Sequence, residues 1–283
     1  LDPGYALAHS GLADCHTVIS AYAAIPPREA YARAKAAAQK ALELDPTLGE
    51  ALASLGALKL IDEWDWEGGN RDLLSAQQLS PGYASAHQWR ALYLLPMGRA
   101  EEVLSELRRA HELDPLSLLI STRVGDALYA VGRYQEAIEQ YRQTLALDPN
   151  FGQARLGLGK VLVHQGKYAD ALAELRRASQ LSEGDPYVLA NLGYACALAG
   201  RKAEARETLA DLQERSRRGY FPSLALAIVC IGLGERDRAF EWLRKSVEER
   251  DVNLCWLRLD PLFAPLRSDP RFAELLRLMK VKP

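Results

Sequence analysis

Residues 124–149 read VGDALYAVGRYQEAIEQYRQTLALDP. Gly132 follows Gly125 by seven residues, and a glycine at this place favours the left-handed C-cap that ends a helix. The proline that closes the stretch, Pro149, cannot continue a helix. After Gly132, apolar residues share one helix face at spacings of three and four: Tyr134, Ala137, Ile138 and Tyr141. The stretch therefore predicts two helices joined by a tight turn.

The same pattern recurs every 34 residues along the chain. One row of glycines holds this interval: Gly98, Gly132, Gly166, Gly200 and Gly234. A row of small residues precedes it by seven positions: Ala91, Gly125, Gly159, Gly193 and Ala227. A row of large apolar residues follows it: Leu107, Tyr141, Leu175, Leu209 and Leu243. These rows in register indicate a repeat architecture in which each small residue lets a neighbouring helix approach closely.

These rows resemble the tetratricopeptide repeat, which has the same period and a similar order of small, aromatic and proline positions. The resemblance implies an all-α, right-handed solenoid of about seven helix pairs. We place the repeat array at residues 1–250, with units at roughly 4–46, 47–81, 82–115, 116–149, 150–185, 186–219 and 220–250. The second unit departs from the pattern, because WDWEGG, residues 64–69, stands where a short turn is expected.

Residues 251–283 lie beyond the repeats and are predicted to form a C-terminal capping segment. Asp269 and Pro270 supply an N-cap followed by proline in the first turn of a helix. Apolar side chains then line one face of that helix: Phe272, Leu275, Leu276 and Met279. Because the last repeat of a solenoid exposes an apolar face unless something covers it, we expect this helix to act as the cap.

The string DPLFAPLRSDPRFAELLRLM, residues 260–279, is similar to the end of one group of bacterial proteins. The opening YALAHSGLAD, residues 5–14, and the turn around Trp64 and Trp66 are similar to that group as well. In the group, a tetratricopeptide array follows a winged-helix DNA-binding domain, a class III adenylate cyclase domain or a serine/threonine kinase domain. The resemblance implies the C-terminal part of a bacterial signalling or transcription protein, and it leaves open whether such a domain precedes residue 1.

Composition places the chain among ordinary globular proteins. It has 283 residues, of which 48% are hydrophobic and 25% charged, and these values exclude disordered, collagen-like and disulfide-scaffold classes. The 35 basic and 37 acidic residues nearly balance, so charge gives no reason to expect nucleic acid or an anionic membrane as the partner. The longest strongly apolar stretch, residues 224–233, is far shorter than the ~20 residues of a membrane-spanning helix.

No set of residues in the sequence has the spacing of a catalytic or metal site. The five histidines include no pair at a spacing of four and no His-Glu-x-x-His motif. The four cysteines include no Cys-x-x-Cys motif, and Cys196 and Cys230 occupy equivalent repeat positions that are apolar elsewhere. Phosphate-binding glycine loops and nucleophile elbows are missing too. We therefore expect no enzyme activity, no cofactor and no metal.

The concave face of such a solenoid is lined by first-helix residues that are not used in packing between helices. The 34-residue frame gives the following candidate groove residues: Gln88, Trp89, Leu92, Thr122, Arg123, Asp126, Tyr129, Lys160, Tyr187, Asn191 and Tyr194. Aromatic anchors in a concave patch are typical of peptide or helix capture. The alternative is that these aromatic residues simply fill a tight superhelix.

Two groove chemistries known for this repeat are missing. Chaperone-binding arrays hold a peptide carboxylate with lysine and asparagine on successive first helices, whereas the corresponding pairs here include Thr122/Asp126 and Leu156/Lys160. Nucleocytoplasmic O-linked glycosyltransferases carry an asparagine ladder along the groove, and only Asn191 stands in that row here. Neither a chaperone tail nor a glycosyltransferase function is therefore expected.

The first hypothesis is a non-catalytic, cytoplasmic module that binds a protein or peptide segment in the concave groove. This chain itself is expected to contact neither nucleic acid nor membrane. A second hypothesis is a self-assembling scaffold, in which one copy binds another as a homo-oligomer. A third is a small-molecule-sensing regulatory domain. The sequence leaves the partner and the oligomeric state open.

Overall fold

A computed structural model describes residues 4–19, 26–182 and 184–282. Residues 1–3, 20–25, 183 and 283 belong to the predicted repeat array and its C-terminal segment, and they lie outside the described residues. The described part of the chain is all-helical, as expected.

The helices form consecutive pairs, and from α5 to α11 the first helices of successive pairs begin 34 residues apart. The described helices pair as α1 (Ala6–Ile19) with α2 (Pro27–Leu44), α3 (Gly49–Leu58) with α4 (Trp66–Leu79), α5 (Ala84–Leu94) with α6 (Ala100–Leu113), α7 (Leu118–Ala130) with α8 (Tyr134–Leu147), α9 (Gly152–His164) with α10 (Tyr168–Leu181), α11 (Pro186–Leu198) with α12 (Lys202–Arg218), and α13 (Ser223–Leu233) with α14 (Arg236–Glu249). Three short helices follow: η3 (Val252–Trp256), η4 (Pro261–Leu266) and α15 (Pro270–Leu278). The predicted solenoid of helix pairs is confirmed.

The row of glycines at the helix–helix turns has the predicted left-handed backbone. All five of these glycines have positive φ, between 71° and 80°. At the turn between α7 and α8, the Gly132 amide donates to the Tyr129 carbonyl at 3.0 Å, and the Arg133 amide donates to the Leu128 carbonyl at 2.9 Å. These paired bonds satisfy carbonyls that the end of a helix otherwise leaves without donors.

The row of small residues lets each first helix pack closely on its second helix. A Cβ atom added at Gly125 would lie 2.5 Å from the ring of Tyr141, and one added at Gly159 would lie 2.6 Å from Leu175. Tyr141 and Leu175 are both fully buried. Glycine is therefore required at these two positions because a large side chain fills the space of its missing Cβ.

The unusual second turn is a structured element. Helix α3 continues into η2 (Lys59–Glu63), a π-helical turn, and Trp64 ends it in the left-handed conformation with φ 51°. Asp65 caps α4 by accepting a hydrogen bond from the Gly68 amide at 3.0 Å. A Cβ atom at Gly68 would lie 2.0 Å from the Asp65 carboxylate, which explains one of the two glycines in this motif.

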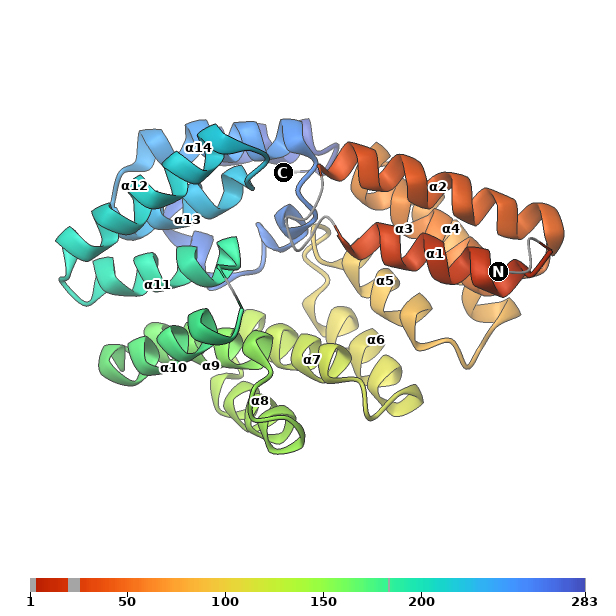
Figure 1. Cartoon of the computed structure of the whole chain (residues 1–283), viewed down its shortest axis with the longest axis horizontal. Coiled ribbons are helices and arrows are strands. Elements are labelled where there is room, and N and C mark those ends of the chain that lie inside the picture. The colour runs from red at the N-terminus through yellow and green to blue at the C-terminus, as the bar shows by residue number, and fades with distance from the viewer. Residues whose placement is uncertain (1–3, 20–25, 183, 283) are drawn as a thin grey trace.

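The array curves until its two ends meet (Figure 1). The indole N–H of Trp66 donates to the carbonyl of Met279 at 2.8 Å. The Arg250 guanidinium lies 3.8 Å from the ring centre of Trp64, and the Lys280 ammonium donates to the Glu63 carbonyl at 3.0 Å. The second turn therefore binds the residues that follow the seventh helix pair.

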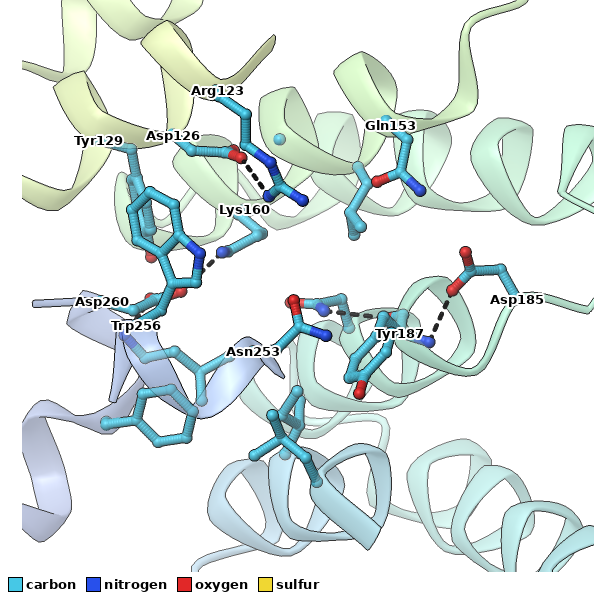
Figure 2. Close-up of a pocket in the computed structure, with 17 residues that line it drawn as sticks. Arg123, Asp126, Tyr129, Gln153, Lys160, Asp185, Tyr187, Asn253, Trp256 and Asp260 are labelled. Carbon is cyan, nitrogen blue, oxygen red and sulfur yellow. Dashed lines mark hydrogen bonds and ion pairs between the residues drawn. The ribbon is translucent and has the colours of Figure 1, made fainter. Parts of the chain in front are cut away.

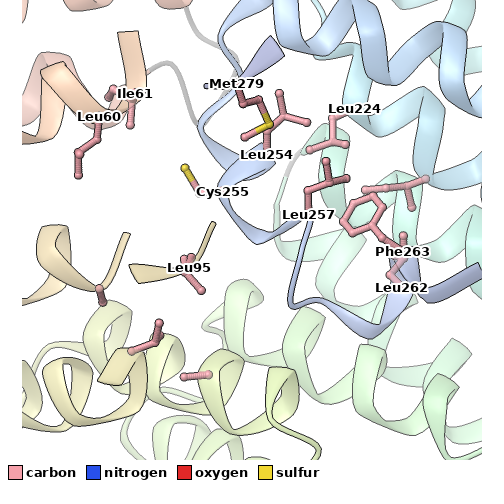
Figure 3. Close-up of a cluster of buried hydrophobic side chains, with 14 of the residues drawn as sticks. Leu60, Ile61, Leu95, Leu224, Leu254, Cys255, Leu257, Leu262, Phe263 and Met279 are labelled. Carbon is pink, nitrogen blue, oxygen red and sulfur yellow. The ribbon is translucent and has the colours of Figure 1, made fainter. Parts of the chain in front are cut away.

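The segment that contains η3 and η4 lies against the concave side of the array rather than only at its end. Asp260 forms an ion pair with Lys160 on α9 at 2.6 Å. Apolar side chains of the segment are buried, and Figure 3 shows them with residues of α13 and of the second and third repeats: Leu254, Cys255, Leu257, Leu262 and Phe263. Residues 251–267 therefore contact much more of the array than its last repeat.

Candidate functional site

Two neighbouring cavities lie on the concave side, between the first helices and the η3–η4 segment. The first, which we call the polar cavity, has a volume of about 980 Å³ including its open mouth, and Figure 2 shows the residues that line it. Its lining residues are Arg123, Asp126, Tyr129, Gln153, Leu156, Gly157, Lys160, Asp185, Tyr187, Asn191, Leu224, Ile228, Asn253, Trp256, Asp260, Leu262 and Phe263. Helices α7, α9, α11 and α13 supply one wall, and the η3–η4 segment supplies the other.

The second, which we call the apolar cavity, lies toward the N-terminal repeats and has a volume of about 710 Å³ including its mouth. Its lining residues are Thr17, Val18, Gln88, Trp89, Ala91, Leu92, Leu95, Leu107, Leu119, Arg123, Val252, Asn253 and Trp256. Arg123, Asn253 and Trp256 line both cavities. The two cavities are therefore adjacent and share one boundary.

Most of the groove candidates from the sequence line one of these cavities. Those on the polar cavity are Arg123, Asp126, Tyr129, Lys160, Tyr187 and Asn191. Those on the apolar cavity are Gln88, Trp89, Leu92 and, again, Arg123. Thr122 and Tyr194 line neither. Thr122 is buried and its hydroxyl donates to the Leu118 carbonyl at 2.8 Å, while Tyr194 packs over Gly232 on α13.

The two cations of the polar cavity already have acidic partners. Arg123 pairs with Asp126 on the same helix at 3.0 Å. Lys160 pairs with Asp260, and its ammonium also lies 5.1 Å from the ring centre of Tyr129. Burial raises the pKa of the Tyr129 hydroxyl well above its usual value, so this tyrosine stays protonated beside the pair. An anionic ligand that approached either cation would therefore lie beside the carboxylate that already pairs with it.

Tyr187 serves to hold η3 in place. Its hydroxyl donates to the buried carboxylate of Asp251, which also accepts from the Asn253 amide at 2.9 Å. Burial raises the pKa of Asp251, and the hydrogen bonds from Tyr187 and Asn253 act in the opposite direction. The sequence suggests Tyr187 as an aromatic anchor for a peptide. In the structure, its hydroxyl is instead hydrogen-bonded to the chain's own C-terminal segment.

Two polar groups on the polar cavity are unused by the protein. Within the described residues, neither the side-chain amide of Gln153 nor the indole N–H of Trp256 has a hydrogen-bond partner, and Figure 2 shows both side chains facing the cavity. Asp185 differs, because it caps α11 by accepting from the backbone amides of Tyr187 and Val188 at 2.8 and 3.1 Å. The cavity therefore offers uncharged donors and acceptors among completed ion pairs.

The sequence frame misses the wall that η3 and η4 contribute, which includes Asn253, Trp256, Leu262 and Phe263. It also misses Gln153 and Asp185 on the helices. One signal could have located the short helices. Asp251, Asp260 and Asp269 are spaced nine residues apart, and each caps a helical turn by accepting from the amide two residues later, at 2.9 to 3.0 Å. The sequence does not say which surface these turns lie against.

The described residues include no arrangement of side chains suited to metal binding or to thiol chemistry. No group of three His, Cys, Asp or Glu side chains there could hold a metal ion. Burial raises the thiol pKa of Cys230 to about 11 and that of Cys255 to about 12, so both thiols stay protonated at neutral pH. Among the described helices, none has the length and apolar character needed to cross a membrane.

Family comparisons match three parts of the chain. Residues 123–186 and 162–218 match tetratricopeptide repeat families, and residues 24–152 match the bacterial transcriptional activator domain. Tetratricopeptide and bacterial transcriptional activator domains are typically non-catalytic, and tetratricopeptide domains in general bind peptides or proteins. No curated protein sequence matches the chain significantly.

Solved structures with the same fold are numerous. A tetratricopeptide repeat protein from Parabacteroides merdae aligns with a TM-score of 0.60 and 14% identity, covering 93% of this chain and 97% of its own. PilW, a type IV pilus biogenesis factor, aligns with a TM-score of 0.59 and 18% identity over 79% and 97% of the two chains.

A thermophilic tetratricopeptide protein of Thermus thermophilus aligns with a TM-score of 0.55 and 19% identity, over 66% and 98%. At these identities the likeness shows the fold alone. The chain is therefore an array of tetratricopeptide repeats, of which residues 123–218 match the repeat families, and residues 24–152 are similar to the bacterial transcriptional activator domain.

Proposed function

We propose that this chain is the non-catalytic regulatory module of a bacterial transcription regulator that works in the cytoplasm, and that it binds a short segment of a partner protein at the mouth of the polar cavity. The activator-domain match at residues 24–152 supports the transcriptional role. The repeat family supports protein binding as the kind of work the module does.

One observation carries the choice of surface. Gln153 and Trp256 face the polar cavity with hydrogen-bonding groups that the protein leaves unused, whereas the neighbouring Arg123 and Lys160 are paired. Neither unused group belongs to the fully buried polar atoms without a partner, so water or a ligand can reach both and supply the missing bond. A partner segment at the wall between α9 and η3 can therefore bond both groups without breaking an ion pair.

The test places a photo-crosslinking side chain at position 153 in living cells. Position 135 on α8 serves as the matched control, because Gln135 is an exposed glutamine in the neighbouring repeat. A partner protein should crosslink from position 153 and not from position 135. The proposal fails if both positions give the same products, or if position 153 gives none while the purified variant keeps the helical circular dichroism of the parent.

A second candidate function is the sensing of a small molecule, and the η3–η4 segment favours it. Leu254, Leu257 and Leu262 of this segment are buried, so the segment is a fixed part of the concave side. It leaves two cavities there instead of a continuous groove. Cavities that are mostly apolar, with a few convergent polar groups, are typical of small-molecule sites.

A further inference from the structure

The chemistry of the two cavities differs across their shared boundary. On one side, the wall beyond the shared Arg123 comes from α1, α5, α6 and α7. Thr17 and Gln88 are its polar residues, and its larger apolar residues are Val18, Trp89, Leu92, Leu95, Leu107 and Leu119. On the other side, Gln153 and Asn191 add amides to the wall. Trp256 and Asn253 stand between the two sides. A molecule that spans the boundary meets mostly apolar side chains at one end, and amides beside ion pairs at the other.

Charge limits what the polar end accepts. Its two cations are neutralised by Asp126 and Asp260, and Asp185 adds a third carboxylate. An anionic group would meet this excess of carboxylates or would have to break an ion pair, and leaving a half-buried carboxylate without its partner is costly. The side chains of this wall that make no hydrogen bond or ion pair within the described residues are uncharged: the Gln153 amide and the Trp256 indole N–H. An uncharged head group that both donates and accepts hydrogen bonds fits them.

The apolar end favours an aliphatic chain. Leu92 and Leu119 are only partly buried, so their surface remains available to a ligand. Each methylene group of a ligand that is buried there contributes about 0.8 kcal/mol. Leu95 and Leu107 of the same wall are buried, which gives the cavity a preformed floor.

We propose that the two cavities together form the binding site of a small amphiphilic molecule, with an uncharged amide or hydroxyl head in the polar cavity and an aliphatic tail in the apolar cavity. This inference rests on the second function proposed above. An extended peptide fits less well, because a chain running along the first helices would have to displace the buried Leu254 and Leu257.

The test uses the purified chain and the uncharged fluorophore N-phenyl-1-naphthylamine, which brightens in apolar cavities. Three competitors with an eight-carbon acyl or alkyl chain displace it at pH 7: N-octanoylethanolamine, octanoate and octylamine. The uncharged amide should displace the fluorophore at a concentration at least about tenfold lower than either ion does, and N-butanoylethanolamine should be at least about tenfold weaker than the octanoyl compound because it loses four methylene groups.

Three variants connect the effect to the site. Leu119→Gln should weaken binding of every compound, because it places an amide in the apolar cavity. Gln153→Leu should reduce the preference for the uncharged amide over octanoate and leave the tail effect in place. The control, Gln135→Leu, makes the same change at an exposed position on α8 and should alter neither. Thermal unfolding followed by circular dichroism identifies any variant that has lost its fold, in which case Leu92→Gln replaces Leu119→Gln.

The outcomes separate the inference from the function on which it rests. If octanoate or octylamine matches the amide, the cavity binds small molecules but the head-group assignment is wrong. If the folded chain binds neither the fluorophore nor any competitor, the second function and this inference both fail. If N-acetyl-alanyl-alaninamide, an uncharged dipeptide with no aliphatic tail, displaces the fluorophore as well as the octanoyl compound does, the occupant is a peptide and the amphiphile assignment is overturned.

Discussion

Lys160 on α9 and Asp260, the N-cap of η4, form an ion pair at 2.6 Å across the concave side, although 100 residues separate them in the sequence. Both side chains are largely shielded from solvent, at 19% and 9% exposure. Asp260 also accepts from the Leu262 amide at 2.9 Å. The pair therefore fastens the C-terminal segment to the middle of the array at the point where the segment begins η4.

Replacing Lys160 should weaken this attachment. In Lys160→Met the carboxylate of Asp260 keeps its cap bond but loses its counter-charge in a poorly solvated place, and breaking a buried pair on one side costs about 3–5 kcal/mol. Because Lys160 is partly exposed, we expect about 1–3 kcal/mol here. Urea unfolding measures the loss.

Lys167→Met is the control, since Lys167 is an exposed lysine in the same repeat. The double variant Lys160→Met/Asp260→Asn removes both charges and should recover part of the stability that Lys160→Met loses. Equal midpoints for the two single lysine variants would show that the ion pair does not hold the segment.

The contact between Trp66 and Met279 joins the two ends of the array. Trp66→Phe keeps the apolar ring but removes the N–H that donates to the buried Met279 carbonyl at 2.8 Å, so about 1–3 kcal/mol of local stability should be lost. Hydrogen exchange should quicken first in residues 270–282. Trp242→Phe is the matched control, because the Trp242 indole N–H makes no hydrogen bond among the described residues. Uniform exchange changes along the whole chain would contradict a local attachment.

The repeat frame could be predicted from sequence because its determinants are local. Gly132 ends a helix and Gly125 admits Tyr141, and both constraints act within a single 34-residue unit. The same frame placed Arg123, Asp126 and Lys160 on the first helices, and they do line the polar cavity.

The rest of the site depends on contacts between distant parts of the chain. In the sequence, Asp251 and Asp260 are residues typical of helix caps. Their side-chain partners in the fold, Tyr187 and Lys160, lie 64 and 100 residues away in the sequence. Trp256 reaches the cavity only because the array curves enough to enclose the segment. The periodicity of a single sequence does not encode that curvature, so the second wall of the site could not be predicted from the sequence.

Glycines of the array should respond to alanine with opposite signs, according to their surroundings. Gly125→Ala forces a methyl group to within 2.5 Å of the fully buried ring of Tyr141, and overpacking of this kind costs about 1–3 kcal/mol. Gly11 in α1 has no neighbouring atom within 4 Å of an added Cβ, so Gly11→Ala should stabilise by about 0.5–1 kcal/mol. Urea unfolding of both variants checks the signs. A stabilising Gly125→Ala would mean that Tyr141 moves freely, against its complete burial.

Asp251 and Asp269 should give opposite pH dependences of stability. Burial raises the pKa of Asp251 in the folded chain, so the native state binds more protons than the unfolded chain there, and the contribution of Asp251 to stability falls as pH rises through the interval above its unfolded pKa. Hydrogen bonds from Arg271 lower the pKa of Asp269 to about 2, so its contribution is present above the unfolded pKa near 3.8 and is lost as pH falls toward 2.

The measurement is urea unfolding of the parent, Asp251→Asn and Asp269→Asn between pH 2.5 and 8. The stability difference between the parent and Asp251→Asn should shrink as pH rises above 4. Only the parent has a carboxyl group at this buried position, and ionising it there costs free energy. The difference between the parent and Asp269→Asn should grow from pH 2.5 to pH 5 and then stay level. Parallel curves for the two asparagine variants would show that Asp251 is solvated in the folded chain, and hence that η3 is not held against Tyr187.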